Sequence, residues 1–474
     1  KILDDNVTAA KLANSINTDI ATGVTGNTTA NAALPKAGGT MTGNLVFADS
    51  VRARFGASND LQIFHDTNNS YIENTGTGDL IIQDSGGDVR IKGKSNEDSI
   101  VANNDGSVDL YYDNAKKFET TTAGVTVTGN VNGLAITTTA TSNIGLGANA
   151  VNSITTGDYN IGLGDDAGTA ITEGHRNVFL GWEAGKATTT GSNSIAIGKA
   201  ALLVNTTGGE NVAIGNAALD ANTTASENTA VGYNSMSATT TGAENVAVGA
   251  SSLDTNTTGT KNVAIGNSAL TANTTGSQNT ALGFEAASSN TTGGIVAIGY
   301  QSGKDATTAI GNVLVGELSG TNITTGNNNS AFGSQALSTV TTGASNSAFG
   351  HDALRTNTAS NNTAVGYNSL TANTTGANNV AVGQTALKLN TTASNNTAIG
   401  QESLHTNTTG ADNVAVGRDA LYSNTTASNN TAVGRDALVF NTTGASNVAV
   451  GKDALKANTT ASYNTAIGAN SMVS

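Results

Sequence analysis

A five-residue phrase, Asn-[Val/Thr]-Ala-[Val/Ile/Leu]-Gly, returns twenty times with small variations between Asn143 and Gly468, and it constrains the fold of this chain most strongly. Seventeen of the nineteen steps between successive phrase glycines are 17 residues long, and the other two, Gly283 to Gly299 and Gly350 to Gly366, are 16. Such a fixed period indicates a repeat architecture in which each unit packs on its neighbours. We call each unit a coil and number its positions 1 to 17 from the phrase Asn.

The composition fits a fibre better than an enzyme. Only 37% of the 474 residues are hydrophobic and 4% aromatic, with 57 glycines and a single proline, Pro35, so the chain cannot build one large globular core. Disordered chains can share this composition, but they do not keep Val or Ile locked to a strict period. The net charge of −14 argues against nucleic acid or an anionic membrane as partner, since both need a basic surface.

Two further absences narrow the possibilities. No apolar run approaches about 18 residues, so we expect no membrane insertion. The chain contains no cysteine, which excludes disulfides and thiolate metal sites. Stability must therefore come from burial and backbone pairing.

The sequence divides into four segments. Residues 1–34 carry a loose stripe of apolar residues spaced by four or five, which leaves a short helical lead-in and an irregular linker both open. Residues 35–131 read as a β-rich shaft module, 132–142 as a linker, and 143–474 as the 17-residue repeat.

Within the second segment, short apolar runs bounded by Asn, Asp or Gly predict nine strands. Their ranges are 51–55, 61–65, 70–73, 80–83, 89–92, 99–102, 108–112, 117–121 and 125–128. A sheet with so few apolar residues would be poorly stable alone, so we expect association between chains to supply the missing burial.

The repeat predicts which residues each coil buries. Position 4 is apolar and position 2 is β-branched or Ser in all twenty coils, while position 3 is Ala in sixteen. Because side chains alternate along a strand, we expect positions 2 and 4 to face the core and the small position 3 to face a neighbouring sheet. Leu at position 9 supplies a second buried point. Four coils have Gly there and also lose the Asn at position 12, which predicts a second type of rung filled from the other side (Gly168, Gly185, Gly303 and Gly320).

A 17-residue unit with two short strands and two corners predicts a parallel β-solenoid, an all-β fold, with Asn-Thr-Thr at one corner. Asn stands at position 1 in eighteen of the twenty coils, and stacked Asn side chains can form amide ladders. We expect such a structural ladder at Asn211, Asn228, Asn245, Asn262, Asn379, Asn396 and Asn413. From Thr358 onward, coils with Thr-Thr-Gly alternate with coils with Thr-Ala-Ser, which gives a 34-residue super-period.

The phrase Asn-Val-Ala-Val-Gly, followed by Gly-x-x-Ala-Leu, resembles the Ser-Val-Ala-Ile-Gly repeats of trimeric autotransporter adhesin heads. Over the whole chain, the opening Lys-Ile-Leu-Asp-Asp-Asn-Val-Thr segment, the Gly-Gly-Thr-Met-Thr-Gly phrase at 38–43 and the coil array together resemble tail fibres of marine bacteriophages. The resemblance implies an elongated homotrimer, packed or intertwined, in the virion tail. It would join a tail, baseplate or other fibre protein at its N-terminus and a host cell-surface glycan or protein elsewhere.

Two alternatives stay open: a bacterial trimeric adhesin on the cell surface, and a capsule-degrading tailspike. Stacked acidic residues such as Asp419, Asp436 and Asp453 could suggest paired hydrolase carboxylates. However, a basic residue precedes each of them, so a mixed-charge solvated face is more economical. The four histidines are far apart in sequence. We therefore expect no catalytic residues, no metal and no cofactor.

Position 6, directly after the phrase glycine, is the best candidate for contact with a receptor. It is mostly polar or charged, hence expected to be exposed, yet five coils place an aromatic there: Trp182, Tyr233, Phe284, Tyr300 and Tyr367. Exposed aromatic side chains can stack on sugar rings. The alternative, that each ring packs on side chains of adjacent coils, is favoured by the sequence.

Overall fold

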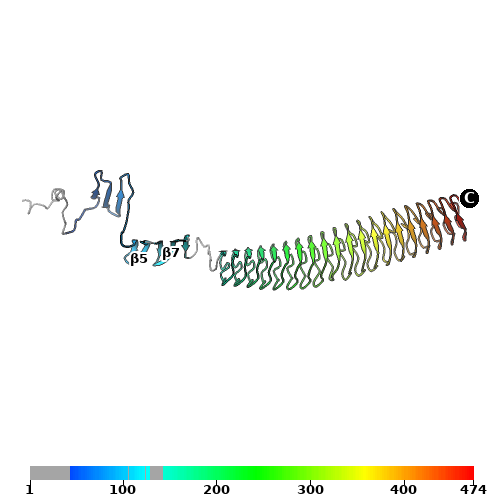
Figure 1. Cartoon of the computed structure of the whole chain (residues 1–474), viewed down its shortest axis with the longest axis horizontal. Coiled ribbons are helices and arrows are strands. Elements are labelled where there is room, and N and C mark those ends of the chain that lie inside the picture. Colours follow the sequence, from blue (N-terminus) through cyan, green and yellow to red (C-terminus); the bar gives the residue numbers. More distant parts are fainter. Residues whose placement is uncertain (1–42, 105, 123, 129–141, 474) are drawn as a thin grey trace, which may run out of the picture. The chain divides into compact units, whose positions relative to one another are not determined.

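The computed structural model describes residues 43–104, 106–122, 124–128 and 142–473, and the described residues are all-β. The predicted lead-in and nearly all of the predicted linker lie outside these residues. The chain forms two compact units, one ending at Thr126 and one beginning at Val127, and Figure 1 traces both.

The first unit contains two antiparallel sheets. Strands β1 (Arg52–Phe55), β2 (Leu61–His65) and β3 (Ser70–Asn74) form one. The second has the order β4 (Val89–Lys94), β5 (Glu97–Ala102), β6 (Val108–Tyr112), β7 (Ala115–Thr121) and β8 (Gly124–Val127). Eight of the nine predicted strands are thus confirmed, within a few residues at their ends.

The predicted strand at 80–83 is wrong. Leu80, Ile81 and Ile82 are exposed and belong to no sheet of the described residues, although their apolar side chains suit a strand. A strand requires a neighbour to take up its backbone hydrogen bonds, and the sequence pattern of one segment does not show whether a neighbour exists.

The five-stranded sheet has two unlike faces. Direct cross-strand partners place Ile91, Ile100, Leu110 and Phe118 in one row across β4 to β7. Both Ile91 and Leu110 are exposed. The adjacent row belongs to the opposite face and includes Asp109, which is only 3% exposed. The apolar row is therefore the uncovered side of this sheet.

The second unit is a parallel β-solenoid, which confirms the predicted fold class. It has twenty strands of three residues each, and every strand pairs with the next one in the sequence. Equivalent positions of neighbouring coils lie opposite each other; for example, Val212 at position 2 lies opposite Thr229 at position 2. The stack is open, since β9 pairs with β10 and β28 with β27, and Figure 1 shows them at opposite ends of it. The strands are β9 (Ile144–Leu146), β10 (Ile161–Leu163), β11 (Val178–Leu180), β12 (Ile195–Ile197), β13 (Val212–Ile214), β14 (Thr229–Val231), β15 (Val246–Val248), β16 (Val263–Ile265), β17 (Thr280–Leu282), β18 (Val296–Ile298), β19 (Val313–Val315), β20 (Ser330–Phe332), β21 (Ser347–Phe349), β22 (Thr363–Val365), β23 (Val380–Val382), β24 (Thr397–Ile399), β25 (Val414–Val416), β26 (Thr431–Val433), β27 (Val448–Val450) and β28 (Thr465–Ile467).

Each coil contains one strand, not the two that we predicted. The return segment through positions 6 to 14 consists of turns and bends, because the residues at positions 7 and 9 adopt positive φ, such as Ala217 at 51° and Leu219 at 54°. A strand cannot continue through the left-handed region. The Asn-Thr-Thr segment is bent, which confirms its predicted place at a corner.

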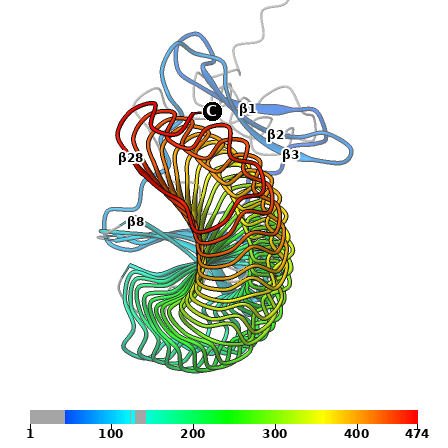
Figure 2. The same cartoon turned by 90° about the vertical axis from the view of Figure 1, so that its right-hand side faces the viewer.

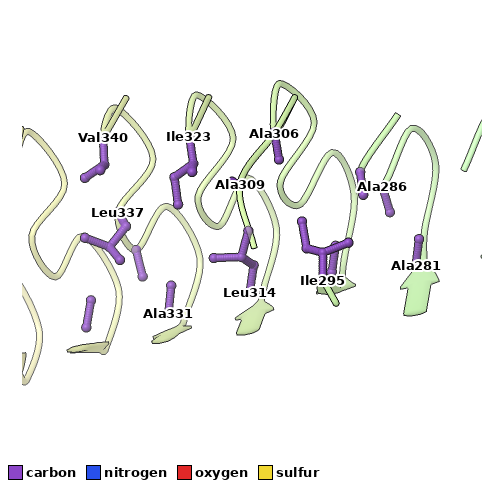
Figure 3. Close-up of a cluster of buried hydrophobic side chains, with 14 of the residues drawn as sticks. Ala281, Ala286, Ile295, Ala306, Ala309, Leu314, Ile323, Ala331, Leu337 and Val340 are labelled. Atoms are coloured by element: carbon purple, nitrogen blue, oxygen red, sulfur yellow. The ribbon is translucent and has the colours of Figure 1, made fainter. Parts of the chain in front are cut away.

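The predicted orientation of the strand is also wrong. Ala213 at position 3 is fully buried, whereas Val212 and Ile214 on either side of it are only half-buried. The reason is the narrow interior: Leu219 at position 9 reaches in from the return segment and is itself fully buried, so the strand opposite has room for a methyl group only. Figure 3 shows this inward set, with Ala281 and Ala331 on strands and Leu337 entering from the return segment. The large apolar side chains of the strand therefore point outward.

The phrase glycine is required by its backbone. Gly215 has a φ of 138°, and a Cβ there would lie 2.2 Å from the carbonyl oxygen of Gly232 in the next coil. Any other residue would be strained by this φ, and its Cβ would clash with the carbonyl oxygen of the next coil.

The second type of rung is confirmed in two of its four coils, those with Gly185 and Gly320. In the coil beginning at Asn177, position 9 is Gly185 and position 3 is Phe179 instead of Ala, and Phe179 is fully buried. A Cβ on Gly185 would lie 2.6 Å from the Phe179 ring. Gly320 stands in the same relation to Leu314, at 2.7 Å. The interior volume is thus filled from whichever side of the coil carries the large side chain.

The Asn ladder is confirmed. The Oδ1 of Asn211 accepts the backbone N–H of Asn228 in the next coil at 3.0 Å, and its Nδ2 donates across its own coil to the carbonyl of Ala225 at 2.9 Å. A second ladder runs through position 12, where Asn222 Nδ2 donates to Asn205 Oδ1 at 2.8 Å. All these amides are fully buried, and buried polar groups require partners of this kind. Seen along the stack, successive coils rotate steadily (Figure 2).

Candidate functional site

The five aromatic residues at position 6 lie on the surface, as predicted. Their exposed fractions run from 42% for Phe284 to 59% for Tyr233. Position 6 directly follows the turn at the phrase glycine, so each ring emerges at the end of its strand. Among the five, only Phe284 and Tyr300 belong to consecutive coils; Trp182, Tyr233 and Tyr367 stand apart.

Four of the five rings contact a side chain of an adjacent coil. Phe284 and Tyr300 stack on each other, with centroids 5.5 Å apart and an interplanar angle of 11°. The Nζ atom of Lys199 lies 4.8 Å from the centroid of the Trp182 ring. Tyr367 stacks on His351 with centroids 5.7 Å apart. Each of these four rings therefore has one face occupied by its neighbour along the stack, and only the other face and the edge can meet a ligand.

Charged side chains flank the stacked pair. Lys304 Nζ lies 2.5 Å from Glu285 Oε2, and Gln301 Nε2 donates to the same oxygen at 2.8 Å. These hydrogen bonds, that from Lys304 first, lower the pKa of Glu285. A polar cluster thus lies beside an aromatic pair on one side of the stack.

The acidic residues near the end of the repeat form ion pairs. Asp419 lies 2.8 Å from Arg418, and Asp453 lies 2.8 Å from Lys456. The hydrogen bond from Lys456 lowers the pKa of Asp453 and keeps it ionised. The predicted mixture of charges is present, but the predicted solvation fails at Asp453, which is only 7% exposed.

Elsewhere, burial raises the pKa of Asp220, which lines a shallow groove of about 470 Å³ with Leu203 and Ser237.

All three histidines within the repeat have structural partners. His175 Nδ1 accepts the backbone N–H of Asp158 at 3.0 Å, and His405 stacks on Tyr422 with centroids 5.0 Å apart. His351 has the contact with Tyr367 given above. Among the residues that the structure describes, no three His, Asp or Glu side chains gather closely enough to hold a metal ion. No helix long and apolar enough to span a bilayer occurs in these residues either.

Sequence reasoning missed one surface because it assigned positions 2 and 4 to the core. These residues form two columns on the outside of β9 to β28, and we call them the outer strand face. Its larger members are exposed to an unusual degree for apolar residues in a sheet, for example Leu282 at 43% and Phe349 at 40%. Phe332 and Phe349 stack there with centroids 4.9 Å apart. Alternation along the strand gave the signal for two faces but not which face is inside.

No protein-family model, curated protein or solved structure matches this chain.

Proposed function

We propose that this chain is a structural, non-catalytic fibre of a phage tail that mediates or positions attachment to a host surface. It works as a homotrimer whose N-terminal unit, a shaft module, joins a tail, baseplate or other fibre protein. The contact with the host is a cell-surface glycan or protein.

The observation that carries the proposal is the uniform stack of coils. Twenty strands in parallel register, at the usual spacing of about 4.8 Å, give a rod roughly 95 Å long. Each coil is paired with the next through its strand, as Val212 with Thr229, and buried Asn side chains add further hydrogen bonds between most neighbouring coils. Such a rod holds its two ends at a fixed distance, which is what an attachment fibre or spacer must do.

The position 6 aromatics are the proposed contact residues. Four of them present an edge and one free face to solvent, which suits shallow contact with a sugar ring. Tyr233 is the most exposed of the five, and we expect it to contribute most to binding.

The test is binding of the intact protein to an array of bacterial surface polysaccharides and to immobilised bacteria. Tyr233→Ala should weaken retention roughly tenfold, the effect of losing one stacked aromatic contact of about 1.4 kcal/mol. Tyr463→Ala is the matched control, because Tyr463 is 85% exposed but lies at position 17. Equal loss in both variants, or no binding by the parent protein, would contradict the proposed contact.

The same incubations distinguish the tailspike alternative. A non-catalytic fibre leaves the number of reducing ends of the polysaccharide unchanged, whereas a tailspike increases it with time.

A further inference from the structure

We infer that the outer strand face is the surface through which copies of this chain associate, side by side, parallel and in register. The inference rests on the proposed function, since it names the surface that forms the homotrimer and the arrangement of its chains. It begins from an uncovered apolar strip that runs the whole length of the solenoid.

The chemistry of the strip is unusual for a surface exposed to water. None of its forty residues is charged: position 2 is Val, Ile, Thr or Ser and position 4 is Val, Ile, Leu or Phe. Most are half-buried, since the same position of the coils above and below covers their sides and no second layer of the unit's described residues lies over them. Contiguous apolar patches beyond a few hundred Å² mark interaction sites.

The area is sufficient for a stable interface. The strip is roughly 95 Å long and about 10 Å wide across the two side-chain positions, hence roughly 900 Å² for each copy. A standard protein–protein interface buries about 800 Å² on each partner.

The regular spacing of the side chains along the strip indicates which partner can cover it. Its side chains rise in steps of one strand spacing over twenty coils, and their columns follow the rotation of the stack seen in Figure 2. A partner in contact along the full length needs the same step and the same rotation. A second copy of this chain has both, and copies that coil around one another keep their strips in contact.

The first unit decides the orientation. Its described residues include exposed apolar rows: Ile91 and Leu110 on the five-stranded sheet, and Ile63 and Ile72 on the three-stranded sheet. Parallel chains bring the first units of all copies to the same end, where these rows can cover one another. Antiparallel chains would leave them apart.

Cysteine cross-linking tests the face and the orientation together, since the chain has no cysteine of its own. Val248→Cys and Val365→Cys place one thiol each on the outer strand face, in the seventh coil from one end and the seventh from the other. Thr258→Cys, on the exposed corner of the coil that contains Val248, is the control. The full-length variants are oxidised mildly, alone and as co-expressed pairs with different tags.

In parallel, in-register chains, Val248→Cys and Val365→Cys should each cross-link only to their own kind and run at twice the 47.0 kDa of one chain, while Thr258→Cys should stay uncross-linked. Disulfides between positions 248 and 365 would instead show antiparallel chains and overturn the orientation. Cross-linking through position 258 alone would overturn the face.

A native mass of 47.0 kDa by light scattering would overturn the association itself. This outcome is separable from failure of the proposed function, because a single-chain rod could still bind polysaccharide through Tyr233. Conversely, cross-linked chains that bind no surface would retain the interface and lose the attachment role.

Discussion

The two units of this chain use opposite means to hold their strands together. In the solenoid, each strand covers a closed interior in which Leu, Ala and Asn side chains are fully buried. In the described part of the first unit, Val101 is the only buried apolar side chain. One unit therefore encloses its core within the chain, and the other leaves its apolar rows to be covered from outside.

The difference predicts which of the two units depends on other chains for its stability. A single-layer sheet has no second layer to exclude water, and few such sheets are stable alone. A solenoid coil gains its second layer from its own return segment and its end cover from the next coil. Stability of the first unit should thus depend on protein concentration far more than stability of the coil interior.

The largest expected effect comes from separating the units. A fragment of residues 43–128 should lose its β-sheet circular dichroism on dilution to low micromolar concentration, while a fragment of residues 143–474 should keep it. Analytical ultracentrifugation of the same samples gives the association state. A monomeric 43–128 fragment with a concentration-independent thermal transition would refute the contrast.

A second experiment concerns the interior of the solenoid, where the two types of rung exchange volume. Phe179→Ala should cost about 3–5 kcal/mol, because it leaves a cavity in a closed core. Adding Gly185→Leu should recover part of that loss, since Leu219 shows that Leu adopts the same positive φ at position 9. Gly185→Leu alone should destabilise through contact with Phe179.

Hydrogen exchange of the peptides spanning 160–198 measures the local free energy of opening for this set. The double variant should be more stable than Phe179→Ala alone, a coupling expected between residues in contact. Additive losses would mean that the backbone of the Gly coils differs from that of the Leu coils.

The two types of rung show how much of the fold the sequence alone predicts. In four coils, such as that of Gly185, Gly replaces Leu at position 9 and the Asn at position 12 is lost as well. Because the two changes occur together, they predicted a second type of rung. They did not show which side of the strand is inside, since alternation is symmetric between faces. Only the positive φ of positions 7 and 9 folds the return segment over Ala, and the pattern of residue types does not reveal those angles.

The super-period gives a similar lesson. The sequence showed coils alternating Gly-Ala with Ala-Ser at positions 15 and 16, and the structure supplies the reason. Ser394 Oγ accepts the backbone N–H of Ala377 in the preceding coil at 3.0 Å, and Ser428 does the same for Ala411. A Cβ on Gly376 would lie 2.1 Å from the carbonyl oxygen of Ala393. Coils are thus joined in unlike pairs, which a search for identical repeats cannot explain.

The smallest expected effect is the acid response of one carboxylate of the first unit, Asp109. Lys116 donates a hydrogen bond to Asp109, with Ser107 and Asn103 adding others, and together they lower the pKa of Asp109 to about 2. Since the folded pKa lies below the unfolded value of about 3.9, this stabilisation is complete above about pH 4 and is lost as the pH falls through 2.

The response of the solenoid should have the opposite sign at its buried acids. Burial raises the pKa of Asp220 and Asp254, so protonation relieves a cost as the pH falls. Hydrogen exchange between pH 4 and 2 should therefore show β5 to β7 losing protection in the parent protein relative to Asp109→Asn, which lacks the titrating group. Because the variant experiences the same change in intrinsic exchange rate, the difference isolates Asp109. An equal loss of protection in the coils around Asp220 would mean that acid acts on the whole chain and not on the unit whose polar face depends on one ionised carboxylate.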